Sequence, residues 1–451
     1  MASFALLMEE EGETEMGTRK GQLHLALSVQ GAGYSIGSWR QSSAKPGKLH
    51  DAAYYYRLAQ TAEQGKLDLL FLDSASAGER LRATGKEPGL PLEPFTLLGG
   101  VASVTRRIGL GAAVSASALE PFGVARQLAA LDHLSGGRLA WQPIPQDSRE
   151  LTCGLGTQAL SPSEQESRLQ EFIEVAELLW NSWEEGAVIA NRETGRYIDS
   201  SKVHLIQHAG KHFRVRGPLS IPRSPQGQPV RIAASAASAY QQAADLDSAE
   251  LVFSYRPSLE EAIEFRAALR QRIASRGRTP DAVKVLATVS PILGTTEEEA
   301  RHKAAELYEW ADPEIGRAYL SDWLNEDLAD YPLDTDSSRI PGLREAVEAV
   351  NLPHAALREH SRRALALTGT HIFIGTPQQL ADWMEAWHAG NGCDGFHLQL
   401  PLLRGELDDL VAHVIPELQR RGLYRTEYAG NTLRDHLDLP NPGVQQLAKE
   451  G

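Results

Sequence analysis

Several residue types are scarce in this sequence, and each shortage excludes a class of protein. The two cysteines, Cys153 and Cys393, lie far apart with no C-x-x-C pair, which excludes a disulfide-rich scaffold and a zinc ribbon and is typical of a protein of the reducing cytoplasm. Positive charge is also short: 45 Lys and Arg stand against 59 Asp and Glu, and the net charge of −14 argues against a nucleic-acid-binding protein. No stretch reaches the roughly 18 consecutive apolar residues of a membrane-spanning helix.

Common catalytic and ligand-binding motifs are missing as well. The chain has no H-E-x-x-H, no P-loop, no G-x-S-x-G, and no G-x-G-x-x-G after its first predicted strand. His354, His360 and His371 do not have the spacing of metal ligands, so we predict no metal site. The motifs of the common hydrolases, nucleotidases and dinucleotide-binding enzymes are therefore absent from the sequence.

The sequence does contain a regular alternation of apolar strands and amphipathic helices. With 42% hydrophobic residues the chain can bury a large core. Alternation of this kind predicts a parallel sheet with helices outside it, and eight such units favour an α/β fold of the (β/α)8 TIM-barrel type over an open, doubly wound sheet. The predicted strands are residues 23–29, 68–73, 108–116, 138–144, 230–234, 250–255, 283–293 and 395–400.

Helices are expected between these strands, and two longer segments interrupt the alternation. Residues 184–228 are polar and rich in Gly and Pro, and residues 311–370 are irregular, so we interpret both as insertions in one barrel domain that covers residues 21–442. Residues 1–20 are interpreted as a disordered acidic leader, residues 443–451 as a tail, and the end of the barrel domain as a C-terminal extension. The predicted helices are residues 51–64, 95–105, 121–134, 163–183, a helix from 238, then 258–275, 296–310, 377–389 and 407–421.

In a TIM barrel the functional residues lie where the strands end. Alternatives exist for each candidate: Asp73 could simply cap a helix, serines 235–238 could be an ordinary N-cap or could bind a phosphate, and His397 could be a structural core histidine. Position and residue type alone therefore predict a site at the strand ends and no particular reaction. The residues at those ends are Asp73, Ser115–Ser117, Gln142, Ser235–Ser238, Tyr255 and His397.

Short segments in a fixed order along the chain carry a family resemblance. The strongest is LDHLSGGR at residues 131–138; others are FLD at 71–73, RIGLG at 107–111, KVHLIQHAGKHFRVRGPL from 202, and DGFHLQLP from 394. In these segments, which run from about residue 21 to 442, the chain resembles the bacterial luciferase-like flavin monooxygenases. More narrowly, it is similar to the nitrilotriacetate and dibenzothiophene-sulfone monooxygenase group.

The resemblance implies a monooxygenase that uses reduced FMN and O2 to oxidise a small organic molecule. A separate NAD(P)H:flavin reductase supplies the reduced FMN in such two-component enzymes, and relatives usually form homo-oligomers. Carried over onto this sequence, the cofactor-binding residues are Asp73 beside the isoalloxazine ring, Ser115, Gln142 and Ser238, while no catalytic residue is assigned.

Some positions depart from the family pattern. Ala113 replaces a usual Thr, Gln142 replaces a usual Asn, Gln165 and Glu166 replace an Arg-Tyr pair near the phosphate, and Tyr240 or Gln241 replaces a glycine. A carboxylate such as that of Glu166 beside a phosphate dianion is unfavourable unless it turns away. The departures leave open an alternative function, that of a flavin-poor, non-catalytic subunit that supports a catalytic partner.

Overall fold

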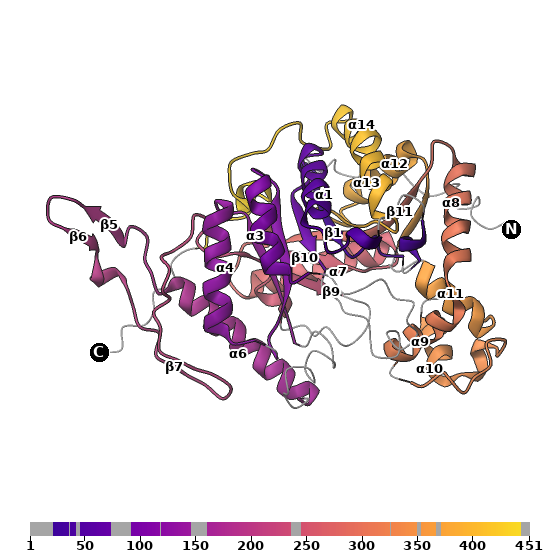
Figure 1. Ribbon diagram of the computed structural model, residues 1–451, viewed down its shortest axis with the longest axis horizontal. Coiled ribbons are helices and arrows are strands. Elements are labelled where there is room, and N and C mark those ends of the chain that lie inside the picture. The colour runs from indigo at the N-terminus through magenta and orange to yellow at the C-terminus, as the bar shows by residue number, and fades with distance from the viewer. Residues whose placement is uncertain are drawn as a thin grey trace.

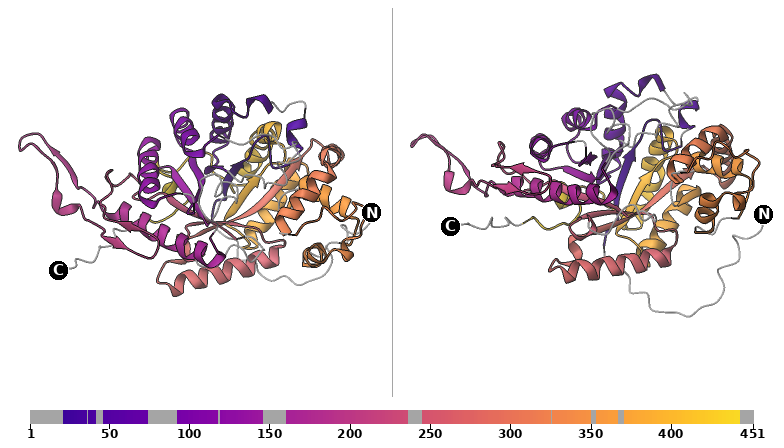
Figure 2. Two further views of the ribbon diagram at one scale, coloured as in Figure 1. Left: turned by 60° about the horizontal axis from the view of Figure 1, so that its bottom comes forward. Right: turned by 90° about the horizontal axis from the view of Figure 1, so that it is seen from below.

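Eight parallel strands close into a barrel in the computed structural model, which describes residues 21–35, 37–41, 46–73, 92–117, 119–145, 160–235, 245–324, 326–349, 353–366 and 371–442 (Figures 1 and 2). Each strand pairs with the next around the ring, and the last returns to β1. The predicted (β/α)8 fold is therefore confirmed. The strands are β1 (His24–Val29), β2 (Leu69–Leu72), β3 (Gly109–Ser115), β4 (Leu139–Ile144), β9 (Val230–Ser235), β10 (Leu251–Ser254), β11 (Lys284–Leu293) and β13 (Gly395–Gln399).

Helices surround the barrel, and several begin at the capping residues that the sequence predicts. The Asp51 side chain accepts a hydrogen bond from the backbone N–H of Ala53 and so starts α1, and Thr296 caps α8 in the same way. The helix predicted from Ser238 falls outside the described residues. The surrounding helices are α1 (Ala52–Gln64), α3 (Pro94–Val104), α4 (Pro121–Ser135), α6 (Pro162–Asn181), α7 (Leu259–Ser275), α8 (Glu297–Trp310), α12 (Pro377–Ala389), and α13 (Leu403–Asp409), which a π-turn joins to α14 (Ile415–Arg420).

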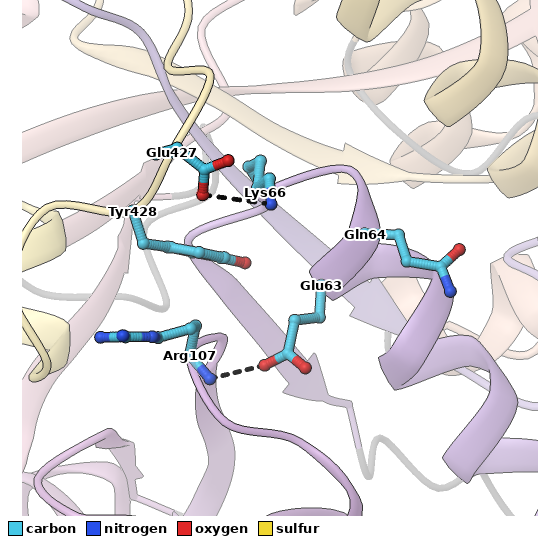
Figure 3. A pocket seen from close by; sticks show the side chains of 6 residues that line it. All are labelled: Glu63, Gln64, Lys66, Arg107, Glu427 and Tyr428. Carbon is cyan, nitrogen blue, oxygen red and sulfur yellow. Dashed lines mark hydrogen bonds and ion pairs between the residues drawn. The ribbon is translucent and has the colours of Figure 1, made fainter.

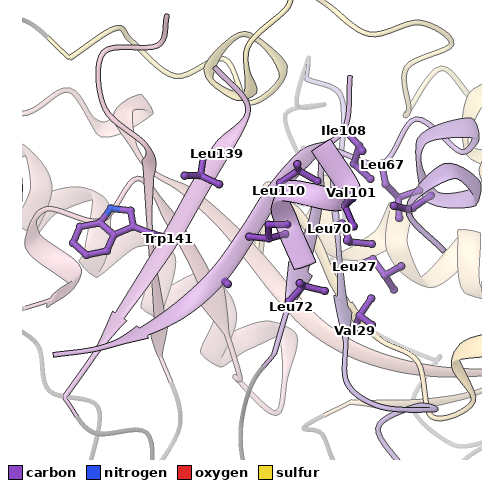
Figure 4. Close-up of a cluster of buried hydrophobic side chains, with 14 of the residues drawn as sticks. Leu27, Val29, Leu67, Leu70, Leu72, Val101, Ile108, Leu110, Leu139 and Trp141 are labelled. Atoms are coloured by element: carbon purple, nitrogen blue, oxygen red, sulfur yellow. The ribbon is translucent and has the colours of Figure 1, made fainter. Parts of the chain in front are cut away.

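Strand side chains point alternately to the helices and into the barrel, and they form two apolar layers. Leu27, Leu70, Leu110 and Leu139 face outward into the layer that also holds Val101 of α3 (Figure 4). Burial of one such leucine is worth about 1.5–3 kcal/mol relative to exposure. The alternate positions form a smaller inner layer, which fills the barrel with Ala26, Leu69, Phe71, Ala140, Val230, Ile232, Leu251, Phe253 and Leu286.

The two insertions differ from one another in structure. Residues 184–228 contain two antiparallel hairpins, β5 (Val188–Asn191) with β6 (Arg196–Ile198) and β7 (His208–Ala209) with β8 (Arg214–Val215). Residues 311–370, predicted to be irregular, instead form α9 (Pro313–Leu324), α10 (Pro341–Ala349) and α11 (Leu357–Ala366) and are followed by β12 (Ile372–Gly375), which extends the sheet beside β11. Glycine within a helix weakens the helical pattern of the sequence, and the packing explains why it is there. A Cβ on Gly316 would lie 2.1 Å from the carbonyl oxygen of Ser361, so only Gly allows α9 and α11 to pack this closely.

The C-terminal extension closes the end of the barrel at which the strands begin. Leu433, Leu437 and Leu439, the first of them in α15 (Leu433–His436), join the inner apolar layer. Arg425 Nη2 lies 2.6 Å from the buried Asp68 Oδ1, next to the first residue of β2. This end of the barrel is therefore sealed by apolar side chains and a buried ion pair. Among the described residues, no helix is long and apolar enough to cross a membrane.

Candidate functional site

Polar side chains replace the inner apolar layer where the strands end. Because side chains alternate with a period of two, the residue two positions after an inner apolar residue also faces inward. At five strands this next residue is polar, so the interior changes from an apolar floor to a polar mouth within one layer. The changes run from Ala26 to Ser28, Phe71 to Asp73, Ala140 to Gln142, Phe253 to Tyr255 and Leu286 to Thr288.

The barrel brings three of the four predicted cofactor-binding residues to one edge of this mouth. Leu72 pairs with Ala112, so Asp73 is level with Ala113, and Ala113 pairs directly with Gln142. Asp73, Ala113 and Gln142 thus form one row across β2, β3 and β4, with the small alanine leaving space between the two polar groups. Ser115 lies one layer higher on β3, where its hydroxyl is 3.1 Å from that of Ser117. Ser238, the fourth predicted residue, lies outside the described residues, as does Tyr240.

Gln142 is a largely buried amide at this mouth, and the residue is 8% exposed. The hydroxyl of Ser35, in the loop after β1, is buried and unsatisfied within the described residues. An unpaired buried polar group costs about 1–3 kcal/mol, so such a group at a strand-end mouth indicates a place where a polar ligand binds.

Asp73 is held by a tyrosine from the loop after β1. The Tyr34 hydroxyl donates a hydrogen bond of 2.8 Å to Asp73 Oδ2. Burial, and next the charge of Asp73, raise the pKa of Tyr34 well above its ordinary value, so Tyr34 remains a proton donor. The backbone fixes this tyrosine: Tyr34 N donates to Leu400 O at 2.9 Å, and a Cβ on Gly33 would lie 2.2 Å from Pro401 O. Only glycine permits this close approach of the loop to the end of β13.

Below this pair, His397 connects strands that are distant in the sequence. Its Nε2 lies 2.6 Å from Ser28 Oγ, its Nδ1 lies 3.1 Å from Thr288 Oγ1, and its ring stacks on Phe253 with the centroids 3.8 Å apart. Burial lowers the pKa of His397 to about 3, so the ring is neutral at physiological pH. The hydroxyl of Ser28 also interacts with that of Tyr34. His397 is therefore a fully bonded structural histidine, and it supports Tyr34 from beneath.

Two further tyrosines face the same carboxylate. Tyr255, at the end of β10, accepts a hydrogen bond of 3.3 Å from Gln399 Nε2. Burial and then the charge of Asp73 raise the pKa of Tyr255, and the same two causes raise the pKa of Tyr319 on α9. The second insertion thus brings a residue to the site. Sequence reasoning assigned no role to Tyr319, and the signal was weak because it lies in a segment predicted to be irregular.

On α6, the positions that depart from the family pattern contact residues of their own helix and the end of β3. Glu166 is half-buried and accepts a hydrogen bond of 3.1 Å from Gln170 Nε2, one turn further along the helix. Arg168 Nε donates to Ala116 O at 2.9 Å, which ties α6 to the end of β3. Sequence analysis does not predict Ser28, Thr288 and Gln399 as site residues. The signal that identifies them is their inward phase on the strands: Thr288 is in register with His397, and Ser28 is in register with Gln399, two residues further along β13.

A pocket of about 320 Å³ lies at the opposite end of the barrel (Figure 3). Lys66 and Arg107 come just before β2 and β3, and Tyr428 belongs to the C-terminal extension. Ion pairs and backbone contacts already occupy its charged groups: Lys66 pairs with Glu427 at 3.5 Å, and Glu63 accepts the N–H of Arg107 at 2.6 Å. The pocket therefore belongs to the sealed end and not to the polar mouth.

Comparisons with known proteins identify close relatives over nearly the whole chain. A family model described as luciferase-like monooxygenase matches residues 31–392. The chain is 39% identical to N-acetyl-S-(2-succino)cysteine monooxygenase of Bacillus subtilis, over 96% of this chain and 100% of the relative. It is 37% identical to nitrilotriacetate monooxygenase component A of Aminobacter aminovorans, over 95% of this chain and 98% of the relative.

Solved structures agree with these sequence relatives. DmoA from Hyphomicrobium sulfonivorans superposes with a TM-score of 0.85 at 27% identity, and the match covers 95% of each chain. A riboflavin lyase, RcaE, solved with modified FMN and riboflavin, superposes with a TM-score of 0.81 at 25% identity, over 93% of this chain and 96% of that one.

Proposed function

Because the chain belongs to the luciferase-like monooxygenase family, we propose that it is the oxygenase of a two-component system that uses reduced FMN and O2 to oxidise a small organic molecule. The observation that carries the proposal is the row of Asp73, Ala113 and Gln142 at the mouth of the barrel. It places a hydrogen-bond acceptor, a small residue that leaves space, and an amide side by side above an apolar floor.

The residues of the mouth fit a flavin. An isoalloxazine ring has one polar edge of nitrogen and oxygen atoms and one apolar, benzenoid edge. The amide of Gln142 and the hydroxyl of Ser35, which is unsatisfied among the described residues, provide hydrogen bonds for the polar edge, while Phe253 and Ile232 belong to the apolar layer beneath. When bound, reduced FMN supplies the chemistry of oxygen activation, which no side chain of a protein can perform.

The residues of this chain bind the flavin, orient its ring and enclose it. We propose that Asp73, fixed by Tyr34, orients the ring, and that the loop after β1 and α9 of the second insertion restrict water at the mouth through Tyr34 and Tyr319. The raised pKa values of Tyr34 and Tyr255 keep both hydroxyls protonated, so they donate hydrogen bonds toward Asp73 or a bound ligand without carrying charge.

The partners follow from the proposed reaction. Reduced FMN has to come from a separate NAD(P)H:flavin reductase, and the name of the relative nitrilotriacetate monooxygenase component A supports an enzyme of more than one component. We also propose a cytoplasmic location, where NAD(P)H is available to that reductase, and a homo-oligomeric state.

Flavin titration tests the proposal directly. Purified protein should quench the fluorescence of FMN and bind reduced FMN more tightly than tens of micromolar. Absence of binding for both redox states would refute the enzyme proposal and support the alternative of a non-catalytic subunit. With a flavin reductase present, O2 uptake measured against a panel of carboxylates, sulfides, sulfones and alkanes then identifies the substrate class.

Asp73→Ala tests the row of residues. It should weaken FMN binding at least tenfold, about 1.4 kcal/mol, because the ring loses the acceptor that orients it. The melting temperature should remain nearly unchanged. Asp281→Ala is the matched control: this exposed carboxylate precedes β11 at the sealed end of the barrel, and its loss should leave FMN binding as in the wild type. A collapse in stability of Asp73→Ala would show instead that Asp73 has a structural role.

A further inference from the structure

A cavity of about 570 Å³ lies on the outside of the barrel wall, between the sheet and α6. Trp141 on β4 and Arg231 on β9 line it from the sheet, and Glu177 lines it from α6. Trp141 belongs to the outer apolar layer, and Arg231 lies between Val230 and Ile232 of the inner layer, so both side chains point away from the barrel interior. The cavity is therefore separate from the polar mouth, and its volume is in the range of small-molecule sites.

Arg231 is a buried arginine whose guanidinium group is only partly used. The residue is 3% exposed, and its Nη1 lies 3.0 Å from Glu177 Oε1. Its Nε and Nη2 are buried, and neither has a hydrogen-bond partner among the described residues. These two nitrogens form one edge of the planar guanidinium, the edge that holds two oxygens of a carboxylate or phosphate at once. Because buried donors without an acceptor are unfavourable, this edge indicates a place where an oxyanion binds.

The charges around the cavity leave one positive charge without a carboxylate. Arg434 Nη2 lies 3.0 Å from Glu250 Oε2, and Arg231 pairs with Glu177. Arg278 also lines the cavity, but among the described residues its guanidinium donates to three backbone carbonyls and to no carboxylate. Burial lowers the pKa of Arg278, and the charge of Glu250 offsets this only in part. Three arginines thus stand against two carboxylates, and an anionic ligand would balance the excess.

Much of the remaining wall of the cavity is apolar. Trp180 lines it from α6, and because the indole N–H of Trp180 donates to Ala125 O at 3.0 Å, this ring offers only apolar surface to a ligand. Pro229 and Pro440 add further apolar surface. An inorganic ion alone would fill only a small part of this volume, so the shape and lining of the cavity favour an anion that carries an organic group.

We propose that this cavity binds a small organic anion, whose carboxylate or phosphate group pairs with the Nε and Nη2 edge of Arg231 and whose apolar part packs beside Trp180. Arg278 supplies the positive charge that the anion balances. The proposal does not depend on the proposed reaction, because the cavity lies outside the barrel and its ligand is measured without flavin.

Isothermal titration calorimetry on the full-length protein tests the site. The probes are inorganic phosphate, phenyl phosphate, acetate and phenylacetate, all at one ionic strength set with chloride so that general screening does not change. At least one aromatic probe should bind more tightly than about 1 mM and at least about tenfold more tightly than its inorganic or methyl counterpart. The comparison of phenyl phosphate with phenylacetate identifies the anionic group that the site prefers. An excess of FMN should leave these affinities unchanged, because a flavin at the mouth does not occupy this cavity.

Substitution of Arg231 separates this site from any other anion site. Arg231→Lys keeps the charge beside Glu177 but removes the planar edge, so it should weaken binding of the aromatic probe at least about tenfold. Arg231→Gln should abolish binding. Arg276→Lys is the matched control: Arg276 follows α7, pairs with Asp247 at 3.1 Å and does not line the cavity, so this variant should bind as the wild type does. Circular dichroism confirms that each variant is folded.

Three results would overturn the proposal. The first is that none of the four probes binds to the wild type. The second is that Arg231→Lys binds the probes as tightly as the wild type does. The third is that FMN displaces the probes, since this would place the anion at the mouth of the barrel and not beside α6.

Discussion

The buried histidine beneath the site allows a quantitative test of the structure. His397→Phe preserves a ring of similar size that can still stack on Phe253, but it removes both hydrogen bonds, to Ser28 and to Thr288. Both hydroxyls belong to buried residues, so each would be left without this partner. At about 1–3 kcal/mol for each unsatisfied group, the variant should lose about 2–6 kcal/mol of unfolding free energy at pH 8.

The size of this loss should depend on pH, and its sign follows from the pKa of His397. Burial lowers the pKa to about 3 in the folded protein, from 6.5 when the histidine is exposed. Below pH 6.5 the unfolded chain binds a proton that the folded protein does not, so wild-type stability falls as pH decreases toward 3. One pKa unit is about 1.4 kcal/mol, so by pH 5 the advantage of the wild type should shrink by about 2 kcal/mol.

Urea denaturation of both proteins at pH 8 and at pH 5 measures this difference. A gap between wild type and variant that is equal or larger at pH 5 would refute the assignment of a neutral, buried His397. His388→Phe is the control, because His388 is equally buried but lies on α12 outside the barrel. Flavin affinity should fall in His397→Phe, since Tyr34 loses its support through Ser28, and should remain unchanged in His388→Phe.

Three other substitutions probe the charges of the fold. Burial raises the pKa of Glu406 to about 8, so stability should fall as pH rises from 4.5 to 8, and Glu406→Gln should abolish that loss in urea denaturation at pH 9. Arg425→Met leaves the buried Asp68 without its ion-pair partner and should cost about 3–5 kcal/mol, whereas Arg301→Met at an exposed pair should cost less than about 1 kcal/mol. Glu166→Tyr should tighten FMN binding; an unchanged dissociation constant would show that this carboxylate points away from the phosphate.

The sequence predicts the barrel well because each strand combines a buried apolar run with a clear boundary. The eight predicted strands all exist, and their bounds agree within a residue or two. The run at residues 68–73, for example, contains β2 and ends at the Asp73 that the structure places at the mouth. The helices of the second insertion are not evident in the sequence because contacts between them stabilise them, such as the packing of Gly316 on Ser361, and a single-sequence pattern does not reveal such contacts.

The site is only partly predictable, for a related reason. The positions of Asp73, Ser115 and Gln142 at the mouth could be predicted because lying at a strand end is a local property of the sequence; their role in binding a cofactor stays a prediction. The contacts of His397 are not local: its partners Ser28 and Thr288 are 369 and 109 positions away in the sequence. Register between distant strands decides such contacts, and register is fixed only when the barrel closes.

The two ends of the barrel differ in their side chains, and this difference explains why a binding site can lie at only one of them. At the end where the strands begin, Leu433 and Leu437 join the inner apolar layer, and Arg425 meets Asp68 in a pair that is stable only while water is excluded. Opening that end for a ligand would expose both. At the other end the hydroxyl of Ser35 is buried and, among the described residues, has no partner, so a polar ligand there gives it a hydrogen bond. The stability of the fold therefore requires the first end to stay closed, and the unsatisfied hydroxyl favours ligand binding at the second.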